Sequence, residues 1–223
     1  MPTPWPAEAQ PLLTSSLIAT ASRRGLVVGG GPEGLVVATT KSVRDALLAT
    51  GQEGEKVKPF EPQGRIPLSS RPTHVTFCSE ENALVVATES DGLLIYDSSA
   101  LLQPNVQPSI LIPTNGTSLR ALIGNPAPET EKVSSFVAMV TINGDLLLAN
   151  LKDGSLTSGP SGSTLRNGVS SVAWSPKGKQ LIAGLADGTC CQLDPQGVAK
   201  ADIPRPPELQ GNKHGEYRRP LFD

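Results

Sequence analysis

Three glycines near the N-terminus have the spacing of a dinucleotide-binding loop. Gly29, Gly31 and Gly34 match the pattern G-x-G-x-x-G. Glu53 and Glu55 lie about 20 residues further on, where such sites carry the acid that binds the ribose. In that chemistry the third glycine opens a helix whose N-terminus meets the pyrophosphate. Here the third glycine precedes a run of strand-forming residues, so we interpret the loop as a turn and predict no bound cofactor.

Histidine and cysteine offer little further chemistry. The chain has two histidines, His74 and His214, and the first adjoins an apolar strand-like run, where we expect a structural role. Cys78, Cys190 and Cys191 form no C-x-x-C pair, and adjacent strand residues point to opposite faces, so we expect no zinc site and no disulfide framework. No serine has a recognisable base partner. We predict no catalytic residue and no metal ligand, and a protein that is not an enzyme.

Composition argues against several classes of function. The 223 residues include 19 basic and 21 acidic side chains, a formal net charge of −2, which does not favour general attraction to nucleic acid or to a membrane surface. No apolar run approaches the roughly 20 residues of a membrane span, and residues 1–10 do not resemble a signal peptide. We therefore expect a soluble intracellular protein. The 22 glycines and 21 prolines favour many short strands joined by turns.

The elements that would position these residues repeat along the chain. Residues 168–194 contain three short runs of alternating apolar side chains, and Asp187-Gly188 between the last two is a strong hairpin signal. A shift of 58 residues aligns two pairs from earlier units, Leu26 with Leu84 and Val28 with Val86. A shift of 97 residues aligns four later pairs, Val75 with Val172, Phe77 with Trp174, Leu84 with Leu181 and Val86 with Ala183. We therefore expect the two aromatic residues to pack in a core.

Four such units indicate the fold class. A looser copy lies at residues 119–148, and the hairpin glycines of the four units are Gly34, Gly92, Gly144 and Gly188. Fourth, outer strands are expected at residues 65–68, 109–113 and 197–200. This spacing predicts an all-β protein, a β-propeller of about four blades in an incomplete ring. The first strands would bring Thr20, Thr76, Arg120 and Ser171 toward the central channel, and these are poor metal ligands.

We divide the chain into three parts. Residues 1–15 are expected to be a flexible N-terminal segment, residues 16–203 a partial propeller, and residues 204–223 a proline-rich connector or truncated tail. Within the propeller, residues 43–49 have the spacing of a short helix or a strand end, and residues 51–58 form a polar loop. The basic cluster of the tail is expected to be solvated and not to contact RNA; it comprises Lys213, His214, Arg218 and Arg219.

Two stretches resemble a known family. Residues 171–189, SVAWSPKGKQLIAGLADGT, and residues 23–47, RRGLVVGGGPEGLVVATTKSVRDAL, are similar to blades of the N-terminal β-propeller of the nucleoporin 159/214 family. The similarity covers roughly residues 15–207, and residues 175–181 are its most specific segment. The resemblance implies a seven-bladed propeller, of which this chain would hold about four blades as a fragment.

The resemblance also implies a function. In that family the propeller lies on the cytoplasmic face of the nuclear pore complex and docks a DEAD-box RNA helicase during mRNA export. The expected partners are therefore such a helicase and other nucleoporins, with no direct contact to nucleic acid or membrane. No helicase-contacting motif matches this chain, so the partner-binding residues stay unassigned. A generic WD-like protein-interaction scaffold is the alternative, and a metal-dependent propeller hydrolase is a further one.

Overall fold

In the computed structural model the strands form four antiparallel sheets, each made of four strands that are consecutive in the chain. The structure describes residues 14–49, 60–157 and 164–204. The first sheet contains β1 (Ile18–Ala21), β2 (Leu26–Gly31), β3 (Gly34–Thr39) and β4 (Gly64–Pro67). The second contains β5 (Pro72–Cys78), β6 (Ala83–Thr88), β7 (Leu93–Asp97) and β8 (Ile110–Ile112). The third contains β9 (Leu119–Gly124), β10 (Phe136–Thr141), β11 (Leu146–Asn150) and β12 (Ser155–Thr157). The fourth contains β13 (Val169–Trp174), β14 (Leu181–Leu185), β15 (Cys190–Leu193) and β16 (Ala199–Ile203).

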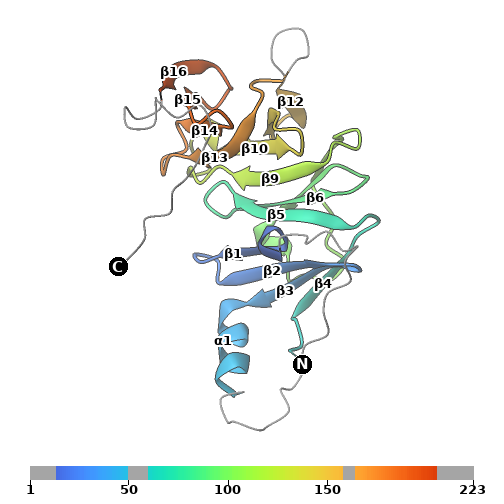
Figure 1. Cartoon of the computed structure of the whole chain (residues 1–223). Helices are drawn as coiled ribbons and strands as arrows, with labels where there is room; N and C mark the ends of the chain where they lie inside the picture. The colour runs from blue at the N-terminus through green and yellow to red at the C-terminus, as the bar shows by residue number, and fades with distance from the viewer. Residues whose placement is uncertain (1–13, 50–59, 158–163, 205–223) are drawn as a thin grey trace, which may run out of the picture.

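The four sheets follow one another in chain order, from the first at the bottom of Figure 1 to the fourth at the top. The first strands of neighbouring sheets lie beside each other, β1 by β5, β5 by β9 and β9 by β13. The fourth strands, β4, β8, β12 and β16, form the opposite edges of the sheets. No strand of the first sheet pairs with one of the fourth within the described residues. The predicted fold is confirmed: these sheets are four blades of a β-propeller whose ring is not closed.

The remaining elements are short. The helix α1 (Thr40–Ala49) follows β3 and decides between the two structures expected at residues 43–49 in favour of the helix. Three 3₁₀ turns, η1 (Thr14–Leu17), η2 (Ser98–Ala100) and η3 (Lys132–Ser135), lie outside the sheets. The three expected outer strands are present as β4, β8 and β16, whereas β12 was not predicted. None of the helices in the described ranges is long and apolar enough to cross a membrane.

Three apolar cores hold neighbouring blades together. The first joins Leu26 and Val28 of one blade to Leu84 and Val86 of the next. The second, between blades two and three, includes Val85, Met139 and Cys78, and the third, between blades three and four, includes Leu148, Leu181 and Cys191. Phe77 and Trp174 pack against the first and third cores, as predicted. Burial of one such large apolar side chain contributes about 1.5–3 kcal/mol, so the interfaces between blades supply most of the stabilisation.

The expected alignment of the first blade with the second is wrong by one residue. Leu26 and Val28 share a core with Leu84 and Val86, so the two pairs face each other across the interface and are not equivalent. Val28 corresponds instead to Val85, because each points toward the blade that follows its own. Side chains of a strand alternate between faces, so a slip of one residue moves every side chain to the other side of the sheet.

The slip arises at the hairpins. In the first blade Gly31 pairs directly with Gly34 across a two-residue turn. In the second blade the N–H of Thr88 donates to the carbonyl of Gly92, which leaves a turn one residue longer. The glycine-rich loop is therefore a hairpin between β2 and β3, as interpreted. The four hairpin glycines are of two kinds: Gly34 begins β3 and Gly92 directly precedes β7, whereas the other two lie within their turns.

The cysteines behave as small apolar residues. Cys78 and Cys191 are buried in cores, and the adjacent Cys190 lies on the other face of β15, half-buried. Burial raises the pKa of the Cys78 thiol.

Several residues that the sequence analysis named lie outside the described residues. They are Glu53, Glu55, Lys213, His214, Arg218 and Arg219.

His74 is buried in β5, where its imidazole lies near the backbone of Arg120 and within 3.2 Å of the Thr73 hydroxyl. Desolvation lowers the pKa of His74 below 6.5, although a hydrogen bond with the Arg120 backbone opposes the shift. The His74 imidazole therefore binds a proton more tightly in the unfolded chain than in the folded one. The contribution of neutral His74 to stability is complete above pH 6.5 and is lost as the pH falls toward the folded-state pKa. We expect the Tm to fall between pH 7 and 5 by about 2 °C more than that of the His74→Gln variant. Parallel pH profiles of the two proteins would contradict this prediction.

Candidate functional site

Four connections lie at the same end of the propeller, because each joins the first strand of a blade to its second. They are residues 22–25, 79–82, 125–135 and 175–180, and we call them the rim. Antiparallel pairing places the hairpins between second and third strands at the opposite end of the blades. The rim is the surface at which the four blades present consecutive turns side by side.

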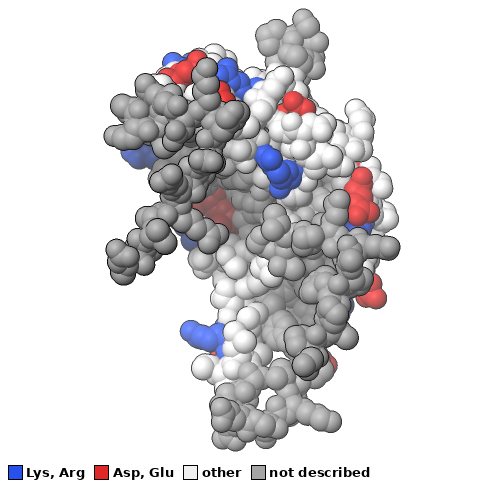
Figure 2. All heavy atoms as spheres, viewed as in Figure 1, with Lys and Arg blue, Asp and Glu red and all other residues white. Residues whose placement is uncertain are grey.

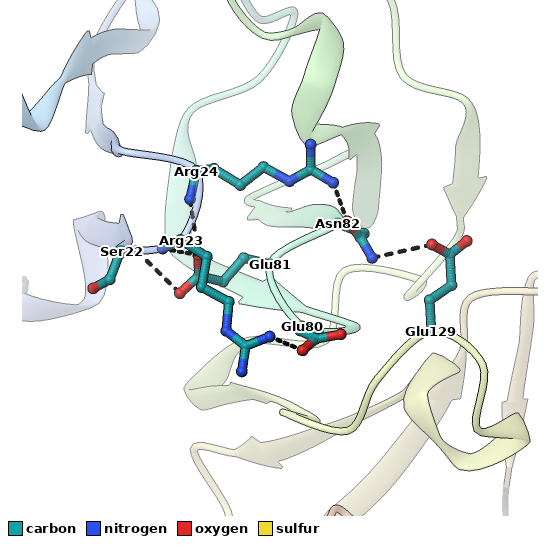
Figure 3. Close-up of polar contacts among 7 residues, drawn as sticks. All are labelled: Ser22, Arg23, Arg24, Glu80, Glu81, Asn82 and Glu129. Carbon is teal, nitrogen blue, oxygen red and sulfur yellow. Dashed lines mark hydrogen bonds and ion pairs between the residues drawn. The ribbon is translucent and has the colours of Figure 1, made fainter.

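Glu81 ties the first blade to the second (Figure 3). Its carboxylate accepts hydrogen bonds from the backbone N–H groups of Ser22 at 3.0 Å, Arg23 at 2.7 Å and Arg24 at 3.3 Å. The Arg23 guanidinium pairs with the carboxylate of Glu80. A carboxylate that accepts several backbone N–H groups makes charge-assisted hydrogen bonds, which are about twice as strong as neutral ones.

Asn82 extends this network to the third blade. Its side-chain oxygen accepts a hydrogen bond from Arg24, and its amide donates to Glu129 at 3.0 Å. Figure 3 shows these residues converging from the turns of three blades. The rim is therefore one connected polar surface and not four independent loops.

The second turn of the rim has a strained backbone. Ser79, Glu80 and Glu81 adopt φ of 54°, 54° and 70°, a conformation that costs non-glycine residues about 1–2 kcal/mol each. Contacts with the third blade hold it: the Ser79 N–H donates to the carbonyl of Asn125 at 3.0 Å, and its hydroxyl donates to the carbonyl of Ser134 at 2.9 Å. Strain of this kind persists only where the surroundings fix it, and it presents Glu80 and Glu81 to the first blade.

Asn125 ties the third blade to the fourth. It is fully buried, and its amide donates to the carbonyls of Val133 at 3.0 Å and Gly178 at 2.9 Å. Its side-chain oxygen accepts from the N–H of Ala127 at 2.9 Å. Gly178 has φ of 64°, and a Cβ at this position would lie 1.9 Å from the Asn125 side-chain oxygen. The turn that the sequence singled out as most specific thus docks on Asn125.

Two further contacts join the same blades. The indole N–H of Trp174 donates to the carbonyl of Ile123 at 3.1 Å, and Lys179 pairs with Glu131 at 3.4 Å. The ion pair is exposed, so its contribution to stability is small, about 0–1 kcal/mol. Between the third and fourth blades the buried hydrogen bonds, and not the surface charges, therefore fix the rim.

A hollow of about 580 Å³ opens on the rim beside the contact between the first two blades. Arg23, Arg24, Asn82, Ser98 and Leu102 are among its lining residues. Ser98 is 2% exposed, and its hydroxyl has no hydrogen-bond partner among the described residues. Polar and apolar residues both line this hollow, so it suits a protein surface that presents both kinds of side chain.

Within the described ranges no three His, Cys, Asp or Glu side chains gather as potential metal ligands.

The residues expected at the channel serve the blade interfaces in two cases. The Thr76 hydroxyl accepts a hydrogen bond from the N–H of Gly124 at 3.3 Å, and the Arg120 guanidinium donates to the carbonyl of Val169. Thr20 and Ser171 are exposed on β1 and β13. Sequence reasoning missed Glu81 and Asn125, and their place in the connection after a first strand is the signal that could have found them.

Charges on the described surface are mixed. Figure 2 shows basic and acidic side chains scattered over the visible face, with no large patch of one sign among the described residues. The formal net charge of −2 agrees with this distribution. A surface of this kind favours specific polar contacts over general attraction to a polyanion.

Comparison with known proteins gives a consistent set of relatives. The family described as NUP159/214 beta propeller matches residues 11–219. Nucleoporin NUP159 of Chaetomium thermophilum is 47% identical over 205 residues, which are 92% of this chain and 14% of that protein. The chain thus spans a small part of this relative.

Two solved structures share the fold. The N-terminal domain of Nup159 matches with a TM-score of 0.54 and 16% identity, over 88% of this chain and 46% of that one. A Saccharomyces cerevisiae complex of Dbp5 bound to Nup159, Gle1, IP6 and ADP matches with a TM-score of 0.55 and 16% identity, over 87% of this chain and 45% of that one. At this identity the two matches establish the propeller fold alone.

Proposed function

Because the chain belongs to the NUP159/214 β-propeller family, we propose that it is a docking scaffold of the nuclear pore complex without enzymatic activity of its own. Its partners are a DEAD-box RNA helicase and other nucleoporins, and its place is the cytoplasmic face of the pore, where it takes part in mRNA export. The observation that carries this proposal is the 47% identity to Nucleoporin NUP159 over 92% of the chain.

A helicase is the favoured partner for a specific reason. The solved yeast complex contains Dbp5 bound to Nup159, and a DEAD-box helicase is the partner that the family resemblance implies. The present chain has the corresponding blade architecture, with four blades described. We assign the docking to the rim, because hydrogen bonds between blades fix its turns in place before a partner arrives, which lowers the entropy lost on binding.

A pull-down with the full chain as bait tests the proposal. We expect the helicase to bind at low salt and to be released as the salt concentration rises, since charges at the edge of an interface act over about 10 Å at 0.1 M. Absence of binding at low salt would contradict the proposal. Mass spectrometry of the bound proteins would show whether another scaffold function applies.

Charge reversal tests whether the rim is the docking surface. Lys132 and Lys177 are exposed on the rim, and the double variant Lys132→Glu, Lys177→Glu should weaken helicase binding by about threefold to tenfold. Glu33→Lys, on an exposed hairpin at the other end of the first blade, is the control and should leave binding unchanged. Equal effects of the rim and control variants would place the docking surface elsewhere.

A further inference from the structure

A second concave surface lies on the outer side of the propeller, between the first and second blades. It has a volume of about 580 Å³, and we call it the outer groove. Residues at or beside β4, β7 and β8 line it, and β4 and β8 are outer strands. None of the contacts described for the rim involves its lining residues.

The floor of the outer groove is apolar and firmly packed. Leu94 and Tyr96 of β7 are 6% and 1% exposed and belong to the core between the two blades, and Val106 packs against that core. Burial raises the pKa of Tyr96 to about 12, so the phenol stays neutral at physiological pH. A rigid apolar floor of this kind binds an apolar side chain without first having to be ordered.

The walls of the outer groove offer an uncovered apolar side chain. Leu111, in the middle of β8, is 50% exposed, and Pro108 and Pro113 lie on either side of this strand. Proline has no backbone N–H, so the ends of β8 cannot extend the sheet with regular hydrogen bonds. The groove therefore favours a ligand that is held by its side chains.

One charged group lies among the lining residues of the outer groove, Asp91. One of its carboxylate oxygens accepts a hydrogen bond from the Ser69 hydroxyl at 2.7 Å. No lysine or arginine of the described residues forms an ion pair with it, whereas neighbouring Glu89 pairs with Arg71. Asp91 can therefore accept a cation from a ligand without breaking an existing ion pair.

We propose that the outer groove binds an extended segment of a partner protein, in which an apolar side chain covers Leu111 and a nearby lysine or arginine pairs with Asp91. The apolar floor supplies affinity, and the single carboxylate supplies selectivity for a basic over an acidic segment. This site is separate from the rim and does not depend on helicase docking.

Fluorescence anisotropy with labelled peptides tests the proposal on the full chain. The probe is Gly-Ser-Leu-Ser-Leu-Lys-Ser-Gly, and two control peptides carry glutamate in place of lysine or serine in place of both leucines. We expect the probe to bind at least threefold more tightly than either control. Failure of the probe to bind at about 1 mM, or equal binding of the glutamate peptide, would overturn the proposal.

Matched variants locate the binding. Leu111→Ser should weaken binding of the probe about tenfold, whereas Leu48→Ser, at an exposed leucine of α1 outside both the groove and the rim, should not. Asp91→Asn keeps a side-chain oxygen for Ser69 and should weaken binding about threefold, with Glu33→Gln as its control. Equal effects of the groove variants and their controls would overturn the assignment.

Sedimentation of the chain without peptide distinguishes a second copy from a different partner. We expect the wild type and Leu111→Ser to sediment alike at all concentrations. A concentration-dependent dimer that Leu111→Ser abolishes would mean that the groove is a contact between two copies, and would overturn the proposal of a basic partner segment.

Discussion

Replacing Gly178 with alanine is expected to destabilise the protein by about 3–4 kcal/mol, because the new Cβ meets a packed neighbour in a left-handed backbone. The Cβ would lie 1.9 Å from the Asn125 side-chain oxygen and 2.6 Å from the Cβ of Ala127, at a φ of 64°. The resulting fall in Tm should be about 10 °C. Urea denaturation or a thermal melt of the full chain measures the effect.

Gly116 provides the matched control for this experiment. Its φ of 72° is nearly the same, but nothing lies within 4 Å of a Cβ built there. Gly116→Ala should therefore cost only the conformational strain, about 1–2 kcal/mol. Equal losses for the two variants would show that the contact between the fourth turn of the rim and Asn125 is not tightly packed.

The second large effect is expected for Asn125→Ala, at about 3 kcal/mol. The change removes three hydrogen bonds at a fully buried position and leaves the carbonyls of Val133 and Gly178 and the N–H of Ala127 without this partner. Buried polar groups without partners each cost about 1–3 kcal/mol. The urea midpoint at unchanged m-value measures the loss of stability.

Asn82→Ala is the control, because Asn82 also bridges blades through its side-chain amide but is far less buried. Its loss should stay below about 1 kcal/mol, since solvent can replace its partners. A loss at Asn82 as large as that at Asn125 would contradict the view that burial decides which rim contacts stabilise the protein. The double variant Asn125→Ala, Gly178→Ala should cost less than the two single losses combined, because removing the Asn125 amide relieves the clash.

Local patterns in the sequence are sufficient to predict the fold class and most strands. Strands such as residues 83–88 and 119–123 have apolar side chains that alternate with polar ones or run continuously, and the hairpins that join neighbouring strands contain glycine. Because these signals depend on neighbours in the chain, they give the fold without knowledge of the packing. The resemblance carried by residues 171–189 and 23–47 identified the family, which the match over residues 11–219 confirms.

The sequence could not predict which face of each strand packs against the neighbouring blade. Leu26 and Leu84 align in a comparison of the two repeats, yet they face each other across one core, because the first hairpin is one residue shorter than the second. A periodicity of two residues does not say which of the two faces meets the next blade. Only the stacking of the sheets decides this point.

The glycine-rich loop could be predicted from the sequence, whereas the contacts of the rim could not. The sequence by itself determined that the segment containing Gly29, Gly31 and Gly34 is a hairpin between strands, because the residues that follow have strand character and do not open a helix. It gave no sign that Glu81 would bind the backbone of Arg23, 58 residues earlier, or that Asn125 would meet Gly178, 53 residues later. These contacts arise only when blades stack, and so tertiary structure alone decided where the rim is held together.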